Sequence, residues 1–317
     1  MNTHEFNVSV IDPVSPAIER ARVMLFKPFD LRKWFVIGFC AWLAYLGSGG
    51  GGGGGGYGGG RGGRPPVIPE AFGQAKGFVL ENLGWIIPVA LIVVVLMIVL
   101  WLVLTWLSSR GRFMFLHCVA ENKAEVKLPW HKFKKHGNSL FLFRIVLGLI
   151  GFAAIGLPIL LTVGCIAMMI AGDGAIVIGV LGCVIIGLIA VAIAIIFALI
   201  GKFTMDFVVP IMFLRTTSCT AGWREFLTIL SVNKARFLLY ILFQIVIGIV
   251  IGTIVLMGIC IGCCLCCVSF LLFIPYIGTV ILLPVFVFTR AYSLLYLKQY
   301  GPQFNVFSQQ IENTNTM

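Results

Sequence analysis

The chain has 317 residues, of which 60% are hydrophobic and only 11% are charged. Soluble domains have about 45–50% apolar and about 25% charged residues, so this composition excludes an ordinary soluble enzyme and indicates a polytopic membrane protein. The net charge of +11 would suggest nucleic-acid binding in a soluble protein, but in a membrane protein it must first be explained by topology.

Residues 1–33 are polar to amphipathic and precede the first long apolar run. Phe26, Phe29 and Trp34 are interspersed with basic residues, a mixture that is typical of anchors at the membrane–water interface. We therefore expect residues 1–33 to form a cytoplasmic amphipathic segment that lies at the membrane surface.

Residues 34–297 contain apolar runs that predict an all-α membrane domain with six transmembrane helices, at about 20 residues per span. The predicted spans are residues 34–46, 84–107, 140–170, 175–201, 237–262 and 277–297. Residues 47–64 contain 14 Gly among 18 positions, a composition that indicates a flexible loop between the first two spans. Residues 298–317 are expected to be a polar C-terminal tail.

The distribution of basic residues predicts the orientation of these spans. With six spans and a cytoplasmic N-terminus, 20 of the 23 Lys and Arg residues lie inside, and only Arg61, Arg64 and Lys76 lie outside. This bias predicts that both termini are cytoplasmic and that residues 47–64 are extracytoplasmic. It also accounts for the net charge, so we expect no nucleic-acid partner.

The spans show a pattern that repeats about every 100 residues. Even-numbered spans end in an aromatic–aliphatic run followed by His117, Arg215 or Arg290, and odd-numbered spans begin with a polar or basic residue followed by aromatic residues. Three duplicated helical hairpins would give this pattern, but membrane interfaces also select aromatic and basic residues without duplication. Trp-x-x-Phe segments before spans 3 and 5 predict interfacial helices on the cytoplasmic face.

Three segments carry a resemblance to a known family: Phe26–Trp34 (FKPFDLRKW), Ser109–Leu116 (SRGRFMFL) and Gly137–Phe141 (GNSLF). The chain resembles an uncharacterised family of bacterial six-span membrane proteins. That family is distantly similar to the membrane domain attached to some glycerophosphodiester phosphodiesterases. The resemblance implies a bacterial inner (plasma) membrane location and the six-span fold. It implies no activity, because the phosphodiesterase domain and its acidic metal site are absent from this sequence.

A cluster of cysteines precedes the last span. Overlapping Cys-x-x-Cys pairs are formed by Cys260, Cys263, Cys264, Cys266 and Cys267. Such pairs suit thiol–disulfide exchange or thiolate metal binding. However, a thiolate is costly in an apolar stretch without a neighbouring base, so packing of small side chains is the favoured interpretation and a redox role is the alternative.

The cytoplasmic connections combine basic and aromatic residues. We predict that they bind anionic lipid head groups or an unknown protein partner, because each base near an anionic leaflet contributes about 1 kcal/mol. The predicted binding residues are Arg110, Arg112, Trp130, Lys132, Lys134, Lys135, Trp223 and Arg224. The alternative interpretation is an ordinary positive-inside anchor.

The sequence contains no Ser-His-Asp arrangement, carboxylate pair or P-loop, and the His and Glu residues of the 109–139 connection lack the spacing of a zinc site. We therefore expect no catalytic activity, no metal and no cofactor. Arg144, Lys202 and Asp206 are expected near the cytoplasmic ends of the spans, which argues against a path for charged substrates. The sequence favours a non-enzymatic membrane protein that binds lipid or a partner. The alternatives are a transporter or channel for lipid-like or small neutral molecules, and a membrane thiol redox protein.

Overall fold

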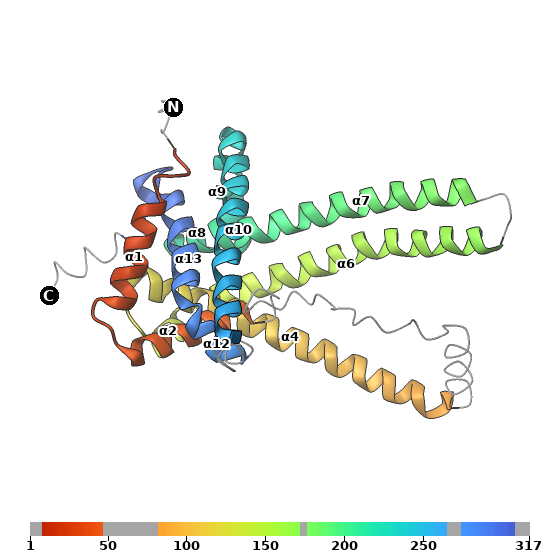
Figure 1. The fold of residues 1–317 in the computed structure, drawn as a ribbon, viewed down its shortest axis with the longest axis horizontal. Coiled ribbons are helices and arrows are strands. Elements are labelled where there is room, and N and C mark those ends of the chain that lie inside the picture. The colour runs from red at the N-terminus through yellow and green to blue at the C-terminus, as the bar shows by residue number, and fades with distance from the viewer. Residues whose placement is uncertain (1–7, 47–81, 172–175, 265–273, 308–317) are drawn as a thin grey trace.

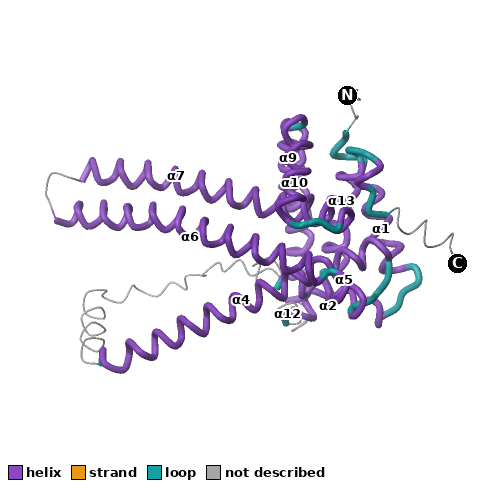
Figure 2. The backbone as a smooth tube through the Cα atoms, turned by 180° about the vertical axis from the view of Figure 1, so that it is seen from behind, coloured by secondary structure: helices purple, strands orange, loops and turns teal. Residues whose placement is uncertain are grey.

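The computed structural model describes residues 8–46, 82–171, 176–264 and 274–307, and all regular secondary structure in these ranges is helical (Figures 1 and 2). The α-helices are α1 (Val14–Phe26), α2 (Leu31–Tyr45), α4 (Leu83–Glu121), α5 (Lys127–Lys132), α6 (Lys134–Ala171), α7 (Ile176–Phe203), α8 (Val209–Arg215), α9 (Cys219–Val232), α10 (Lys234–Cys264), α12 (Pro275–Ile281) and α13 (Leu283–Lys298). A π-helical turn, η1 (Thr204–Val208), joins α7 to α8, and a short 3-10 helix, η2 (Pro302–Phe304), follows α13.

Within the described ranges, four helical stretches are long and apolar enough to cross a membrane: Gly84–Glu121, Lys134–Ala167, Gly179–Arg215 and Lys234–Ile261. They coincide with the second to fifth predicted spans. Helix α4 alone has 39 residues and is about 58 Å long, so it extends well beyond a hydrocarbon core of about 30 Å. The first predicted span coincides with α2, of 15 residues, and the sixth is divided between α12, of 7 residues, and α13, of 16 residues. Each of these helices is shorter than the minimum of about 17 residues, so the six-span arrangement stays a prediction.

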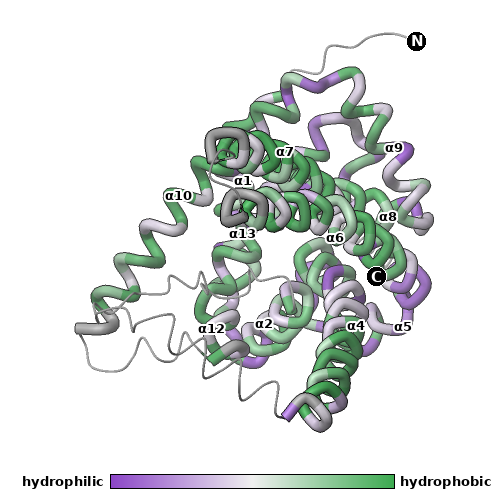
Figure 3. Tube along the Cα trace, turned by 90° about the vertical axis from the view of Figure 1, so that its right-hand side faces the viewer, coloured by the Kyte–Doolittle hydropathy of each residue, from purple (hydrophilic) through white to green (hydrophobic). Residues whose placement is uncertain are grey.

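The long helices α4, α6 and α7 extend from one side of a helical body (Figure 1). We use "body" for α1, α2, α5, α8, α9, α12 and α13 together with the adjoining ends of the long helices. Helices α6 and α7 lie side by side as an antiparallel pair, and α10 leaves the body in a different direction (Figures 1 and 3). The connections from α4 to α6 and from α7 to α10 therefore both lie at the body.

The projecting parts of the long helices are hydrophobic (Figure 3), and many of their apolar side chains are exposed. Leu96 of α4 is 61% exposed, Phe152 of α6 is 81% exposed and Leu188 of α7 is 66% exposed. Apolar side chains that surround a helix on every side need a lipid environment or a protein partner. With the length of these helices, their exposure indicates an integral membrane protein.

The core of the body is rich in aromatic rings. Phe207 of η1 stacks on Phe226 of α9, with ring centroids 5.3 Å apart, and meets Phe237 of α10 edge to face at 5.2 Å. Tyr240 of α10 and Tyr296 of α13 complete the cluster, with ring centroids 4.6 Å apart. Since aromatic pairs in these geometries contribute about 0.5–1.5 kcal/mol beyond area burial, this cluster fixes η1 against α9, α10 and α13.

The N-terminal segment packs against the last long helix of the body. Helix α1 buries the apolar side chains of Ala17, Met24 and Leu25 and lies against α13. The Tyr292 hydroxyl of α13 donates to the Val10 carbonyl at 2.8 Å. The apolar face of α1 is therefore covered by α13.

The first part of the C-terminal tail also belongs to the body. Tyr300, Phe304 and Val306 are all buried. The Gln299 side chain forms reciprocal hydrogen bonds with the Ser9 backbone, at 2.8 and 3.0 Å. These contacts join the two ends of the described chain. Residues 47–64 and 308–317 lie outside the described residues.

Candidate functional site

A cavity of about 710 Å³ lies where α6 and α7 meet the body. Its walls come from the end of α2, from α4, α6, α7 and η1, and from α13. This volume is within the range of about 300–1,000 Å³ that is usual for small-molecule sites. The cavity is the candidate functional site because it collects charged side chains that are distant in sequence.

Five charged side chains line the cavity, and each comes from a different element. The cations are Arg112 of α4, Arg144 of α6, Lys202 of α7 and Arg290 of α13, and the carboxylate is Asp206 of η1. The described lining therefore has four positive charges and one negative charge. Such an excess in a partly enclosed site is a strong attraction for an anion.

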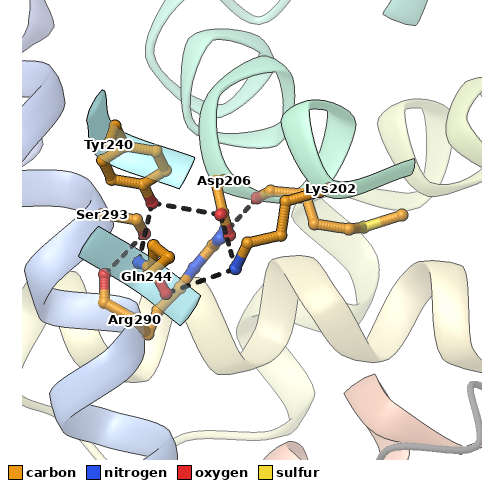
Figure 4. A network of polar contacts seen from close by, with 7 residues as sticks. Lys202, Asp206, Tyr240, Gln244, Arg290 and Ser293 are labelled. Carbon is orange, nitrogen blue, oxygen red and sulfur yellow. Dashed lines mark hydrogen bonds and ion pairs between the residues drawn. The ribbon is translucent and has the colours of Figure 1, made fainter. Parts of the chain in front are cut away.

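A polar network surrounds the single carboxylate (Figure 4). Lys202 Nζ lies 2.9 Å from Asp206 Oδ2, and the Tyr240 hydroxyl donates to the same oxygen at 3.1 Å. Gln244 Nε2 donates to the Tyr240 hydroxyl at 3.0 Å, and Lys202 Nζ donates to Gln244 Oε1 at 3.5 Å. Asp206 therefore compensates the charge of Lys202, and Tyr240 and Gln244 hold this pair in place.

Two arginines next to this network, the buried Arg290 and the half-buried Arg144, are held by hydrogen bonds to neutral groups. Arg290 is 8% exposed, and its Nη1 donates to the Met205 carbonyl of η1. Arg144 Nη1 donates to Ser108 Oγ at 3.3 Å and to Ser109 Oγ at 3.2 Å. These contacts orient both guanidinium groups, and neither group has a carboxylate within ion-pair distance in the described part of the chain.

Arg112 has a different environment. Its Nε atom is buried and has no hydrogen-bond partner among the described residues. A buried donor without a partner costs about 1–3 kcal/mol, and more when the group is charged. An anion in the cavity would satisfy this donor.

The π-helical turn places Asp206 in the cavity wall. A π-helical turn widens a helix by one residue, and such turns are frequent at functional sites. Pro210 lies at the start of α8 directly after η1, and proline cannot donate the backbone hydrogen bond of a regular helix. The proline therefore favours the irregular turn at this point.

The rest of the cavity wall is mainly apolar. It is formed by Leu147, Gly151 and Ile155 on α6 and by Phe197 and Ala198 on α7, among others. Along α6, the distance from Arg144 to Ile155 is about 16 Å at 1.5 Å per residue. This is close to half of the roughly 30 Å hydrocarbon core. The cavity thus has a charged end at the body and an apolar part as long as one lipid leaflet is deep.

The structure separates the predicted binding residues into three groups. Lys132, Lys134, Lys135 and Arg224 are exposed. Arg112 lines the cavity. The other three predicted residues, Arg110, Trp130 and Trp223, contribute to packing in this structure.

Arg110 illustrates the third group. It is 7% exposed, and its guanidinium carbon lies 4.2 Å from the Trp106 ring centroid and 5.0 Å from that of Trp130. Its Nη2 donates to Asn138 Oδ1 at 3.2 Å. Arg110 therefore joins α4, α5 and α6. Trp223 of α9 packs in the same way against Phe143 of α6, with ring centroids 6.1 Å apart.

Sequence reasoning did not select Arg144, Lys202, Asp206 or Arg290 as a site. Arg290 belongs to the recurring charge at the end of even-numbered spans, a pattern that indicates either duplicated hairpins or membrane interfaces and not a binding site. The other three were placed near the ends of spans, and the structure brings all four into one cavity. The signal in the sequence that could have indicated this site is a single charged residue near the end of each of several spans.

Only part of the predicted cysteine cluster falls within the described residues. Cys260, Cys263 and Cys264 lie in α10, where Cys260 is exposed, and Cys266 and Cys267 lie outside the described residues. A second pair, absent from the sequence prediction, is formed by Cys40 of α2 and Cys118 of α4. Their Sγ atoms are 3.8 Å apart and both side chains are buried.

Thiol labelling provides a test of the packing. Burial raises the pKa of Cys219 in α9 to about 12, so only a very small fraction is thiolate at pH 8. We expect maleimide to react with Cys219 more than about 100-fold slower than with a cysteine introduced at exposed Ser231 of the same helix (Ser231→Cys). Mass spectrometry of tryptic peptides after timed labelling measures both rates. Equal rates would contradict the packing of α9.

Residues 8–275 match the model of a family described as a family of unknown function (DUF7544), and this chain therefore belongs to that family. No curated protein and no solved structure matches the chain. The comparison agrees with the resemblance to an uncharacterised family over most of the chain. It shows no link to the membrane domain of phosphodiesterases.

Proposed function

We propose that this family member is a non-enzymatic integral membrane protein that binds an anionic lipid in the cavity between α4, α6, α7 and α13. The observation that carries the proposal is the cavity itself, with four cations, one carboxylate and a long apolar wall. An anionic lipid has the same order of parts, because its charged head group is followed directly by an apolar chain.

The energetics favour a bound anion over an empty site. Within the described residues, Arg112, Arg144 and Arg290 have no carboxylate partner. Hydrogen bonds to charged groups contribute about 1.5–3 kcal/mol each, and a lipid head group would accept several of them. The apolar wall adds the burial of an acyl chain, at about 0.8 kcal/mol per CH₂ group.

We further propose the six-span topology with both termini in the cytoplasm of a bacterial inner membrane. The bias of Lys and Arg in the sequence supports it, as does the meeting of the inner ends of α4, α6 and α7 at the body. The cavity would then lie in the cytoplasmic leaflet. Exposed Lys132, Lys134 and Lys135 would contact anionic head groups at about 1 kcal/mol each.

A transporter for lipid-like molecules is a second candidate, because it would use the same cavity for its substrate. The excess positive charge makes the cavity a poor match for small neutral molecules. An anionic amphiphile is therefore the expected ligand in both cases, and a flux assay in proteoliposomes separates binding from transport.

The proposal predicts that a large side chain introduced into the cavity weakens lipid binding. A Cβ atom at Gly201, which lines the cavity, would meet no atom within 4 Å, so the Gly201→Leu side chain has space to enter. We expect this variant to bind phosphatidic acid and phosphatidylglycerol at least about tenfold more weakly in mixed micelles of neutral detergent.

Gly187→Leu is the matched control. Gly187 lies on the same helix, has equally open surroundings and does not line the cavity. It should bind both lipids like the unmodified protein. Equal binding by Gly201→Leu and Gly187→Leu, with both variants monodisperse, would refute the proposed site.

A further inference from the structure

We infer that the cavity selects a head group with two negative charges, a phosphate monoester on an apolar chain, over the singly charged phosphodiester head groups of common anionic lipids. This inference rests on the proposed function and names the ligand class of the same site. It follows from how the charges of the cavity are compensated.

The first step is the charge count. Lys202 is paired with Asp206 at 2.9 Å, so this pair contributes no net charge. Arg112, Arg144 and Arg290 remain without a carboxylate partner in the described part of the chain. A singly charged head group would leave two of these three charges uncompensated. A doubly charged head group would leave one.

The second step is how the arginines are held. Arg144 is oriented by the hydroxyls of Ser108 and Ser109, whose own protons are donated to the carbonyls of Ala44 and Thr105. The serine oxygens are thus fixed as acceptors. A neutral acceptor positions a guanidinium group without removing its charge, so the charge stays available for a ligand.

Other arginines of this chain show the contrast. Arg215 at the surface is paired with Glu225 at 3.1 Å. Arg110 is covered by the faces of Trp106 and Trp130. The cavity arginines have neither form of compensation, although they lie in less solvated positions than Arg215.

The third step is the number of donors and acceptors. Each guanidinium group has N–H donors in a planar fork that matches phosphate oxygens. A phosphate monoester has three terminal oxygens, whereas a phosphodiester has two. Three guanidinium groups that converge on one cavity therefore match the monoester better.

The apolar wall determines the source of the phosphate. Leu147 and Ile155 of α6 and Phe197 of α7 line the cavity beyond the charged end. A free phosphate compound would leave this wall without a partner. The ligand class is therefore a lipid with a terminal phosphate monoester.

The test uses the full-length protein in mixed micelles of neutral detergent. Three probes are compared: phosphatidic acid, phosphatidylglycerol with the same acyl chains, and glycerol 3-phosphate as the chain-free compound. At pH 8, phosphatidic acid should bind at least about tenfold more tightly than phosphatidylglycerol. Glycerol 3-phosphate should not compete with it.

The pH dependence gives a second readout. The second pKa of a phosphate monoester is about 6, so the monoester carries a single charge at pH 5. The ratio of the affinity for phosphatidic acid to the affinity for phosphatidylglycerol should therefore fall toward one as the pH is lowered from 8 to 5. The titratable and charged groups that face the ligand are Tyr45, Arg112, Arg144, Lys202, Asp206 and Arg290, and Tyr240 contacts Asp206. Phosphatidylglycerol contacts the same groups. Their titration therefore affects the binding of both lipids alike and does not change the ratio of the two affinities.

Each outcome decides between the claims. Equal affinity for the two lipids at pH 8 would overturn the inference and leave the proposed function intact. A preference that persists unchanged at pH 5 would also overturn it. Competition by glycerol 3-phosphate at the same concentration as the lipid would overturn the inference, because it would show that the ligand is a free phosphate compound and not a lipid. Binding of neither lipid would overturn the proposed function itself.

Discussion

Replacing Arg112 with Gln is expected to weaken the binding of anionic lipid about 10- to 100-fold. The change removes one of three uncompensated cations from the cavity, and a charge-assisted hydrogen bond contributes about 1.5–3 kcal/mol. The ligand-free protein should be at least as stable as before, because Arg112 Nε is a buried donor without a partner. Lipid titration and thermal unfolding in the same detergent measure the two effects.

The matched control for this prediction is Lys234→Gln. Lys234 is an exposed base at the start of α10 that does not line the cavity, so its removal changes the net charge equally but leaves the cavity intact. We expect its affinity to change by no more than about twofold, since exposed charges are screened by salt. An equal loss in Arg112→Gln and Lys234→Gln would show that general surface charge binds the lipid, and would contradict the cavity as the site.

Replacing Asp206 with Asn is expected to have opposite effects on stability and on ligand affinity. The ligand-free protein should lose about 1–3 kcal/mol, because Lys202 loses its carboxylate partner. Loss of one member of a buried pair costs about 3–5 kcal/mol, but the Lys202 side chain is 39% exposed and water screens it. The affinity for phosphatidic acid should rise about tenfold, because the cavity gains one uncompensated positive charge.

Glu225→Gln is the control for this second prediction. It breaks the ion pair with Arg215, which lies on the surface. We expect little change in stability and none in lipid affinity, because exposed ion pairs contribute about 0–1 kcal/mol. A fall in lipid affinity in Asp206→Asn would contradict the charge account, since it would mean that the carboxylate itself contacts the ligand.

The sequence predicted the long helices well because a membrane helix has a strong one-dimensional signal. About 20 consecutive apolar residues suffice to identify a span. The predicted span 84–107 was shorter than α4, which continues to Glu121. Beyond Thr105 the helix enters the body and packs against protein, so hydropathy no longer marks its end. Helix α1 shows a related difficulty, because an amphipathic face predicts burial but does not identify the helix that covers it, here α13.

The candidate site was harder to predict because it depends on which helix faces meet. Arg110 and Arg112 are two residues apart on α4, which corresponds to a rotation of about 200° around the helix axis. One therefore lies between Trp106 and Trp130, while the other lines the cavity. The sequence assigned both to the same basic surface. Charges contributed singly by α6, α7, η1 and α13 gave no local motif.

The central claim, that the cavity holds an anionic lipid, is tested most directly by native mass spectrometry after mild extraction from the protein's own membranes. The unmodified protein and Gly187→Leu should each retain one anionic lipid, and Gly201→Leu should lack it. Fragmentation of the released lipid would show a terminal phosphate monoester. An unmodified protein without lipid, or the same lipid retained by Gly201→Leu, would contradict the account.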